Sequence, residues 1–145
     1  MIKKRLRTLA KFLLTVPEGN FKLDTWRNAD GDSNVTDEKL NSHPCGTTAC
    51  AVGWACSIPE FKKLGLSMSY TSDRAWTSCP VFAGKENWKA VNKFFGLARE
   101  ESEYLFQADS YYWEIGIPLP SDVATRIKNF VERGDIHEYS QMPSD

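Results

Sequence analysis

The side chains best suited to covalent chemistry in this sequence are one cysteine and two histidines. Cys45 begins a segment that we predict to be a helix, and a thiol at a helix N-terminus is favoured as the nucleophilic thiolate. His43 and His137 are the 2 histidines of the chain and therefore its candidate bases. This pattern fits a thiol-dependent hydrolase that uses Cys45 with His43 or His137. Small buried thiols are also common core residues, so this interpretation is the less favoured one.

The cysteines predict neither a metal site nor a disulfide. Cys45, Cys50 and Cys56 fall within one predicted helix, where residues five apart project about 140° from one another and cannot converge on one ion. Their Cα atoms would lie about 9 Å apart, which is too far for a disulfide. The N-terminal segment lacks the pattern of a secretory signal, so we expect reduced thiols and no metal ion.

Two short helices predicted within Asn87 to Phe106, joined at Gly96, have the outline of a helix-turn-helix. The second helix carries Glu100, Glu101 and Glu103, and these carboxylates would repel phosphates. The chain has 18 basic and 19 acidic residues, so it has no overall charge to attract a polyanion. A DNA-binding regulator is therefore only an alternative, and nucleic acid is not an expected partner.

Aromatic side chains that no amphipathic helix needs for its core are the candidates for binding. The chain contains 5 tryptophans and 5 tyrosines. Trp26 lies in a polar stretch, whereas Tyr111, Tyr112 and Trp113 follow one another in what we predict to be a loop. Such residues often contact a partner protein or stack on a planar ligand, although they can also simply pack at the ends of the hydrophobic core. These four residues are the predicted binding residues.

Periodicity predicts a basic amphipathic helix at the N-terminus, over residues 1–16, because Leu6, Leu9 and Leu13 recur at helical spacing. A polar loop is expected over residues 20–42, with one short turn of helix near residues 36–40. Another amphipathic helix is expected after Pro120, and residues 135–145 read as a loose tail.

A segment without any charged residue, Cys45 to Ile58, predicts the central helix of the fold, over about residues 45–57. A helix without a polar face is usually buried on all sides. Gly46, Cys50 and Gly53 would lie on one face and let a neighbouring element approach the backbone closely. Glycine within a helix costs roughly 1 kcal/mol relative to alanine, so the packing should require both glycines.

These elements predict a mainly α fold, in which a compact bundle of about five helices surrounds the central helix. An α+β fold is the alternative, because residues 64–82 could form a small β-hairpin. The composition of 41% hydrophobic and 26% charged residues is that of a globular protein, and we expect a single domain over residues 1–145. No apolar segment has the length of a membrane span, so we expect a cytoplasmic protein without a membrane partner.

The string from Cys45 to Ala55 resembles a C-G-T-x-x-C-x-x-G-[WH]-A segment found in small phage and bacterial proteins. Phe94 to Leu97, followed by Leu105 and Phe106, is similar to a second segment that these proteins share. The resemblance implies a phage or bacterial origin. It implies no reaction, cofactor or site residue.

The sequence favours a binding protein over an enzyme, because it lacks a convincing nucleophile-base pair, phosphate loop or metal cluster, and we expect no cofactor. We predict a non-enzymatic, phage-type accessory protein of the host cytoplasm that binds a host protein or sequesters a small ligand. Its binding surface is predicted to be the loop from Asn20 to Ser42 together with Tyr111 to Trp113. The thiol-dependent hydrolase and the DNA-binding regulator are the alternatives.

Overall fold

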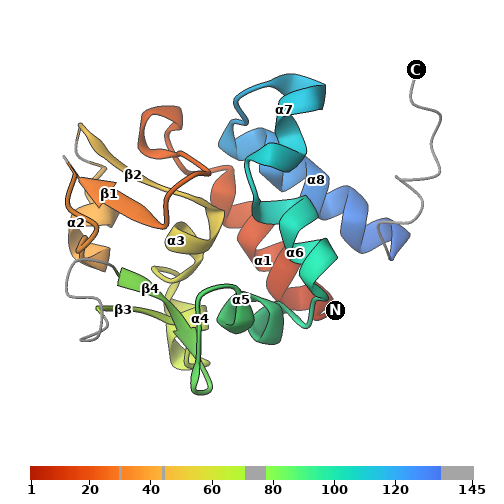
Figure 1. Ribbon diagram of the computed structural model, residues 1–145, viewed down its shortest axis with the longest axis horizontal. Helices are drawn as coiled ribbons and strands as arrows, with labels where there is room; N and C mark the ends of the chain where they lie inside the picture. The colour runs from red at the N-terminus through yellow and green to blue at the C-terminus, as the bar shows by residue number, and fades with distance from the viewer. Residues whose placement is uncertain (30, 44, 71–77, 135–145) are drawn as a thin grey trace.

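The computed structural model describes residues 1–29, 31–43, 45–70 and 78–134, and it shows an α+β fold. The described residues form eight α-helices, one antiparallel sheet of two strands and one of three. Figure 1 shows the sheets at one end of the molecule and the longer helices at the other. The predicted mainly α bundle of about five helices is therefore wrong. The predicted loose tail, residues 135–145, and His137 lie outside the described residues.

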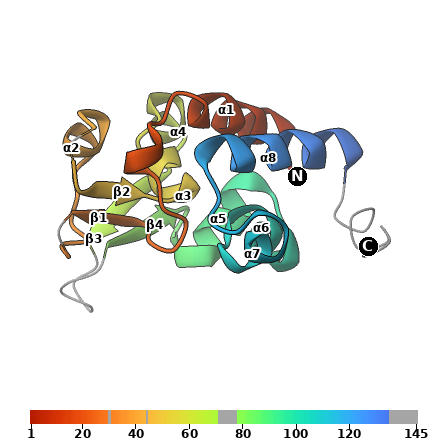
Figure 2. The same cartoon turned by 90° about the horizontal axis from the view of Figure 1, so that it is seen from above.

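The helical end is built on two amphipathic helices, α1 (Lys3–Leu13) and α8 (Pro120–Arg133), which lie side by side in Figures 1 and 2. α1 buries Leu6, Leu9 and Leu13 and exposes all of its basic residues except Arg5, which is partly buried. The expected N-terminal helix is present but shorter than residues 1–16. Three further helices complete this end: α5 (Asn87–Phe95), α6 (Arg99–Phe106) and α7 (Asp109–Ile115). α5 ends at Gly96, which adopts a left-handed backbone conformation that glycine tolerates.

The segment predicted as a polar loop, residues 20–42, contains regular structure. It follows a 3₁₀ turn, η1 (Glu18–Asn20), and holds the strand β1 (Arg27–Ala29) and the helix α2 (Asp37–Asn41). The expected helical turn near residues 36–40 is present as α2, and the Thr36 hydroxyl caps it by accepting a hydrogen bond from the Lys39 N–H. The strand was not predicted, because three residues are too few to show an alternating pattern.

The predicted central helix over residues 45–57 is shorter than expected. Its first part is the strand β2 (Thr47–Ala49), which pairs antiparallel with β1, and only α3 (Ala51–Ala55) is helical. Gly46 has a φ of 84°, which places it in a turn before β2 and not in a helix. The Cys50 sulfur caps α3 by accepting a hydrogen bond from the Gly53 N–H at 3.4 Å. All five residues of α3 are buried, so the segment is central to the core as its composition indicated.

Within residues 64–82, β3 (Ser67–Tyr70) pairs antiparallel with β4 (Ser78–Phe82), following the short helix α4 (Pro59–Lys63). A second hairpin joins β4 to β5 (Lys85–Glu86) through Ala83 and Gly84. These two residues have φ values of 50° and 80°, as a two-residue type I′ turn requires. The second hairpin is thus followed directly by α5, which begins at Asn87.

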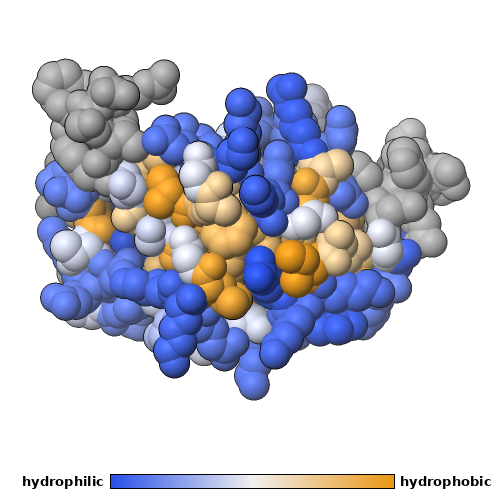
Figure 3. Space-filling model, turned by 90° about the horizontal axis from the view of Figure 1, so that it is seen from below, coloured by the Kyte–Doolittle hydropathy of each residue, from blue (hydrophilic) through white to orange (hydrophobic). Residues whose placement is uncertain are grey.

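Some hydrophobic side chains remain at the surface. Figure 3 shows a band of them across the face seen from below, with hydrophilic side chains on either side. Single exposed apolar residues are normal in folded proteins. No helix among the described residues has both the length and the apolar character that crossing a bilayer demands.

Candidate functional site

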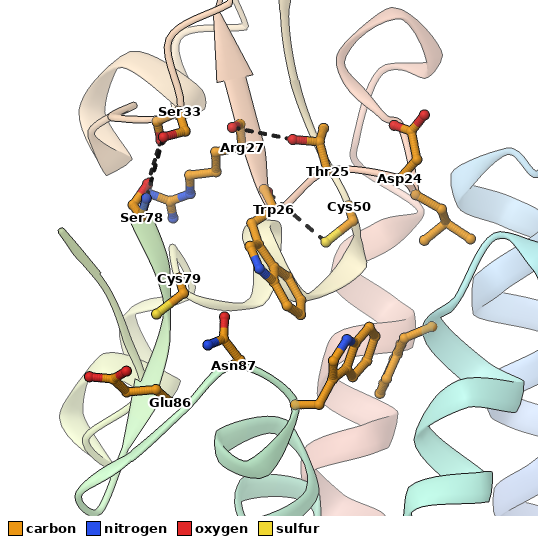
Figure 4. A pocket seen from close by; sticks show the side chains of 13 residues that line it. Asp24, Thr25, Trp26, Arg27, Ser33, Cys50, Ser78, Cys79, Glu86 and Asn87 are labelled. Carbon is orange, nitrogen blue, oxygen red and sulfur yellow. Dashed lines mark hydrogen bonds between the residues drawn. The ribbon is translucent and has the colours of Figure 1, made fainter. Parts of the chain in front are cut away.

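A cavity of about 700 Å³ lies where the two sheets meet the helical end (Figure 4). Its volume is within the range of about 300–1,000 Å³ that small-molecule sites occupy. The wall combines aromatic rings with hydroxyl, amide and carboxylate groups. The segment around β1, the strand β4, the start of α5 and one residue of α6 contribute to it. We call this cavity the tryptophan pocket.

Two tryptophans form its apolar wall. Trp26 directly precedes β1, and Trp88 lies in the first turn of α5. Their ring centroids are 5.0 Å apart and the ring planes are inclined at 52°. Both side chains are partly exposed. Trp26 was a predicted binding residue, whereas Trp88 was not among the residues predicted to bind.

Neither indole N–H of this pair donates a hydrogen bond to any residue in the part of the chain that the structure describes. A partly buried indole N–H normally finds an acceptor. Figure 4 shows the nitrogen of Trp26 on the side of the ring that faces Asn87 and Cys79. The tryptophan pocket therefore presents two donors that no described residue accepts.

Polar side chains border the tryptophans. Asn87 has a φ of 56°, a left-handed conformation that asparagine tolerates better than most residues, and this conformation marks the turn from β5 into α5. Asn87 and the carboxylate of Glu86 are exposed, and neither side chain bonds to any described residue. Asp24 also lines the pocket, and Lys22 lies 3.7 Å from its carboxylate. These groups can accept and donate hydrogen bonds to a ligand.

The backbone of Trp26 is held by a close approach to α3. Gly53 has no side chain, and a Cβ atom placed there would lie 1.8 Å from the Trp26 carbonyl oxygen. The Cys50 N–H donates a 3.0 Å hydrogen bond to the Thr25 carbonyl. The expectation that small residues in this segment admit a neighbouring backbone is therefore confirmed at Gly53.

Arg27 anchors the same strand from the other side. Its side chain is only 1% exposed, and its Nε and Nη2 atoms donate to the Gly53 carbonyl at 3.1 and 2.9 Å. Its Nη1 atom donates to the Val35 carbonyl at 2.9 Å, and Nη2 lies 2.7 Å from Asp37 Oδ1. The guanidinium charge is therefore balanced within the protein, although Arg27 lines the pocket.

Asp37 should make stability sensitive to acid. Burial alone would raise its pKa, but hydrogen bonds from Lys62 and Arg27 and their charges outweigh burial and hold the pKa below its usual value. A lowered carboxyl pKa in the folded state stabilises the protein above the pKa of the unfolded chain, and this contribution is lost as the pH falls through the folded pKa. We expect the free energy of unfolding to fall as the pH is lowered below about 4. Asp37→Asn should reduce that slope in urea titrations, whereas Glu132→Gln on the exposed end of α8 should keep it.

The predicted aromatic loop is the helix α7, and its three aromatic residues have different surroundings. Tyr111 is buried, its hydroxyl donates to the Leu105 carbonyl at 2.7 Å, and the Arg126 guanidinium lies 3.6 Å from its ring centroid. Tyr111 is thus a core residue. Tyr112 is half exposed, and Trp113 is 96% exposed. Ile115, Ile117 and Leu119 are exposed apolar residues of the same stretch, and Ile117 is 82% exposed.

The structure removes one physical basis for an activated Cys45, its place at a helix N-terminus. This cysteine is exposed and precedes β2, so it is not at a helix N-terminus. The His43 ring lies 5.7 Å from the Trp54 ring, measured between centroids. His137 lies outside the described residues. Among the described residues, no three histidine, cysteine or acidic side chains are grouped to hold a metal ion.

Alkylation of the cysteines under native conditions should give one fast-reacting thiol. Burial raises the pKa of Cys50 to about 11 and that of Cys56 to about 12, and Cys79 is buried as well. The Cys50 and Cys56 thiols therefore remain protonated at neutral pH, and burial limits the access of a reagent to all three thiols. We expect iodoacetamide to label Cys45 first in peptide mass spectrometry and Cys45→Ser to remove the fast phase. Equal rates for all four cysteines in the folded protein would contradict this.

The helices α5 and α6 match the expected pair within Asn87 to Phe106. Glu100 is exposed in the first turn of α6, and Arg99 pairs with Glu103 at 2.9 Å. The single basic side chain of α6 is therefore engaged with a carboxylate of its own helix. Nothing in this geometry favours phosphate contacts.

Comparison of the chain with protein-family models, curated proteins and solved structures gives no match.

Proposed function

We propose that the chain is a non-enzymatic binding protein that holds a small ligand in the tryptophan pocket. One observation carries the proposal: a cavity of about 700 Å³ is walled by two partly exposed tryptophans whose indole N–H groups have no acceptor among the described residues. Convergent apolar and polar groups in a preformed hollow are typical of ligand sites. The resemblance of Cys45 to Ala55 to phage proteins favours a phage accessory protein acting in the host cytoplasm.

The five tryptophans allow a direct test by NMR. Each indole N–H gives one signal in a ¹H–¹⁵N spectrum, and Trp26→Phe and Trp88→Phe assign the two pocket signals. A ligand of the tryptophan pocket should shift these two signals and leave that of Trp113 in place. The proposal would be wrong if mixtures of metabolites, sugars, amines and heterocycles at millimolar concentration moved neither pocket signal.

A protein partner is the second candidate, and the exposure of Trp113 and Ile117 favours it. Large exposed aromatic side chains are frequent anchors at protein interfaces. Trp113→Ala should then abolish capture of a host protein, whereas Trp88→Phe should not. Capture that survives both Trp113→Ala and Ile117→Ser would remove this candidate.

A further inference from the structure

The polar groups that line the tryptophan pocket include both donors and acceptors, and most of them have no partner among the described residues. The donors are the indole N–H groups of Trp26 and Trp88 and the side-chain amide of Asn87. The acceptors are the Glu86 carboxylate, without a partner among the described residues, and the Asp24 carboxylate. A ligand that satisfies both kinds must itself both donate and accept hydrogen bonds. Hydroxyl groups do both at a single oxygen atom.

From this pattern we propose that the ligand is a neutral sugar, which the Trp26–Trp88 wall contacts with its apolar face while its hydroxyls bond to Asn87, Glu86 and the indole N–H groups. This inference rests on the proposed function. A sugar ring combines a C–H face, which can pack on an indole, with hydroxyls around its edge. The tryptophan wall and its polar border offer the complementary arrangement within one cavity.

Other ligand classes fit this wall less well. An organic cation would be attracted by the carboxylates and the ring faces, but it would leave the three N–H donors without an acceptor. An anion would meet Glu86 and Asp24, while the charge of Arg27 is already balanced by Asp37.

A planar heterocycle cannot be inserted between the two tryptophans. Their centroids are only 5.0 Å apart, whereas a ring between them would need about 3.5–4 Å of contact distance on each side. It could stack only on an outer face of the pair.

The test is a titration of the full chain with maltotriose, cellotriose and chitotriose, followed through the indole ¹H–¹⁵N signals. Tetramethylammonium chloride, glucose 6-phosphate and adenosine serve as the cation, anion and heterocycle probes. We expect at least one trisaccharide to shift the Trp26 and Trp88 signals saturably below 10 mM. Retention of the protein on beads of the corresponding polysaccharide would show that the polymeric sugar binds too. Trp88→Phe keeps an aromatic ring and deletes one N–H, so it should weaken binding by about 2- to 13-fold, as should Glu86→Gln.

Two variants are matched controls. Trp113→Phe makes the same change at a fully exposed tryptophan, and Glu132→Gln makes the same change on α8, outside the cavity. Both should bind the sugar with unchanged affinity. If only the cation, anion or heterocycle probe shifts the pocket signals, the sugar inference is wrong and the binding function remains. If no probe shifts the pocket signals, the sugar inference and the proposed binding function are both wrong. If a sugar binds Trp88→Phe and Glu86→Gln with the affinity of wild type, it binds outside the tryptophan pocket and the sugar inference is wrong.

Discussion

Replacing Arg27 by alanine is expected to lower the free energy of unfolding by about 3–5 kcal/mol, the usual cost of removing one member of a buried charge pair. The guanidinium donates hydrogen bonds to the carbonyls of Gly53 and Val35 and pairs with Asp37. The alanine variant removes the partner of all three acceptors at once. The side chain also links β1 to α3 and α2, so its loss should loosen the strand that follows Trp26. Urea denaturation monitored by tryptophan fluorescence measures the change.

The matched control is Lys62→Ala. Lys62 also contacts Asp37, but its side chain is 46% exposed, and exposed pairs contribute only about 0–1 kcal/mol. Arg27→Lys keeps the charge but loses the planar fork that reaches several acceptors at once, so we expect most of the alanine effect to persist. Losses below about 1 kcal/mol in both Arg27 variants would show that these hydrogen bonds do not hold the strand.

The helices were predictable because their apolar residues repeat at the helical period over several turns. α1 and α8 each bury such a stripe, and burial of a continuous stripe is what stabilises an amphipathic helix. β1 and β2 have three residues each, and their pairing joins Arg27 to Ala49 across the chain. Neither an alternating pattern of apolar residues nor a turn signal in the sequence predicts such a pair of short strands. The sequence therefore favoured a mainly α fold and gave the α+β class only as the alternative.

Residue type was a partial guide to the site. Trp26 could be singled out because it lies outside every helix that the sequence predicts. Trp88 could not, because it lies in α5 together with apolar residues at helical spacing. The run Tyr111 to Trp113 was read as a loop because three adjacent aromatics show no period. Successive helical residues point about 100° apart, so in α7 only Tyr111 reaches the core and Trp113 faces outward. The donors and acceptors of the tryptophan pocket come together only in the fold.

Gly53→Ala is expected to cost about 3 kcal/mol or more, at the upper end of overpacking effects. The new Cβ would lie 1.8 Å from the Trp26 carbonyl oxygen and 3.0 Å from the Ala49 Cβ, and neither is the tip of a flexible side chain. The backbone of Trp26 must therefore move away from α3, although Arg27 is bonded to the carbonyl of the same glycine. Urea denaturation measures the cost, and the indole signals of Trp26 and Trp88 report the movement.

The matched control is Gly19→Ala, because a Cβ at Gly19 meets no atom within 4 Å and the backbone φ there is not positive. The same change of glycine to alanine should leave stability within about 1 kcal/mol of wild type, since it also restricts the unfolded chain. If Gly53→Ala behaved like Gly19→Ala, the close approach at Trp26 would not hold the pocket wall. A large cost with shifted Trp26 and Trp88 signals would tie the shape of the tryptophan pocket to a single missing side chain in α3.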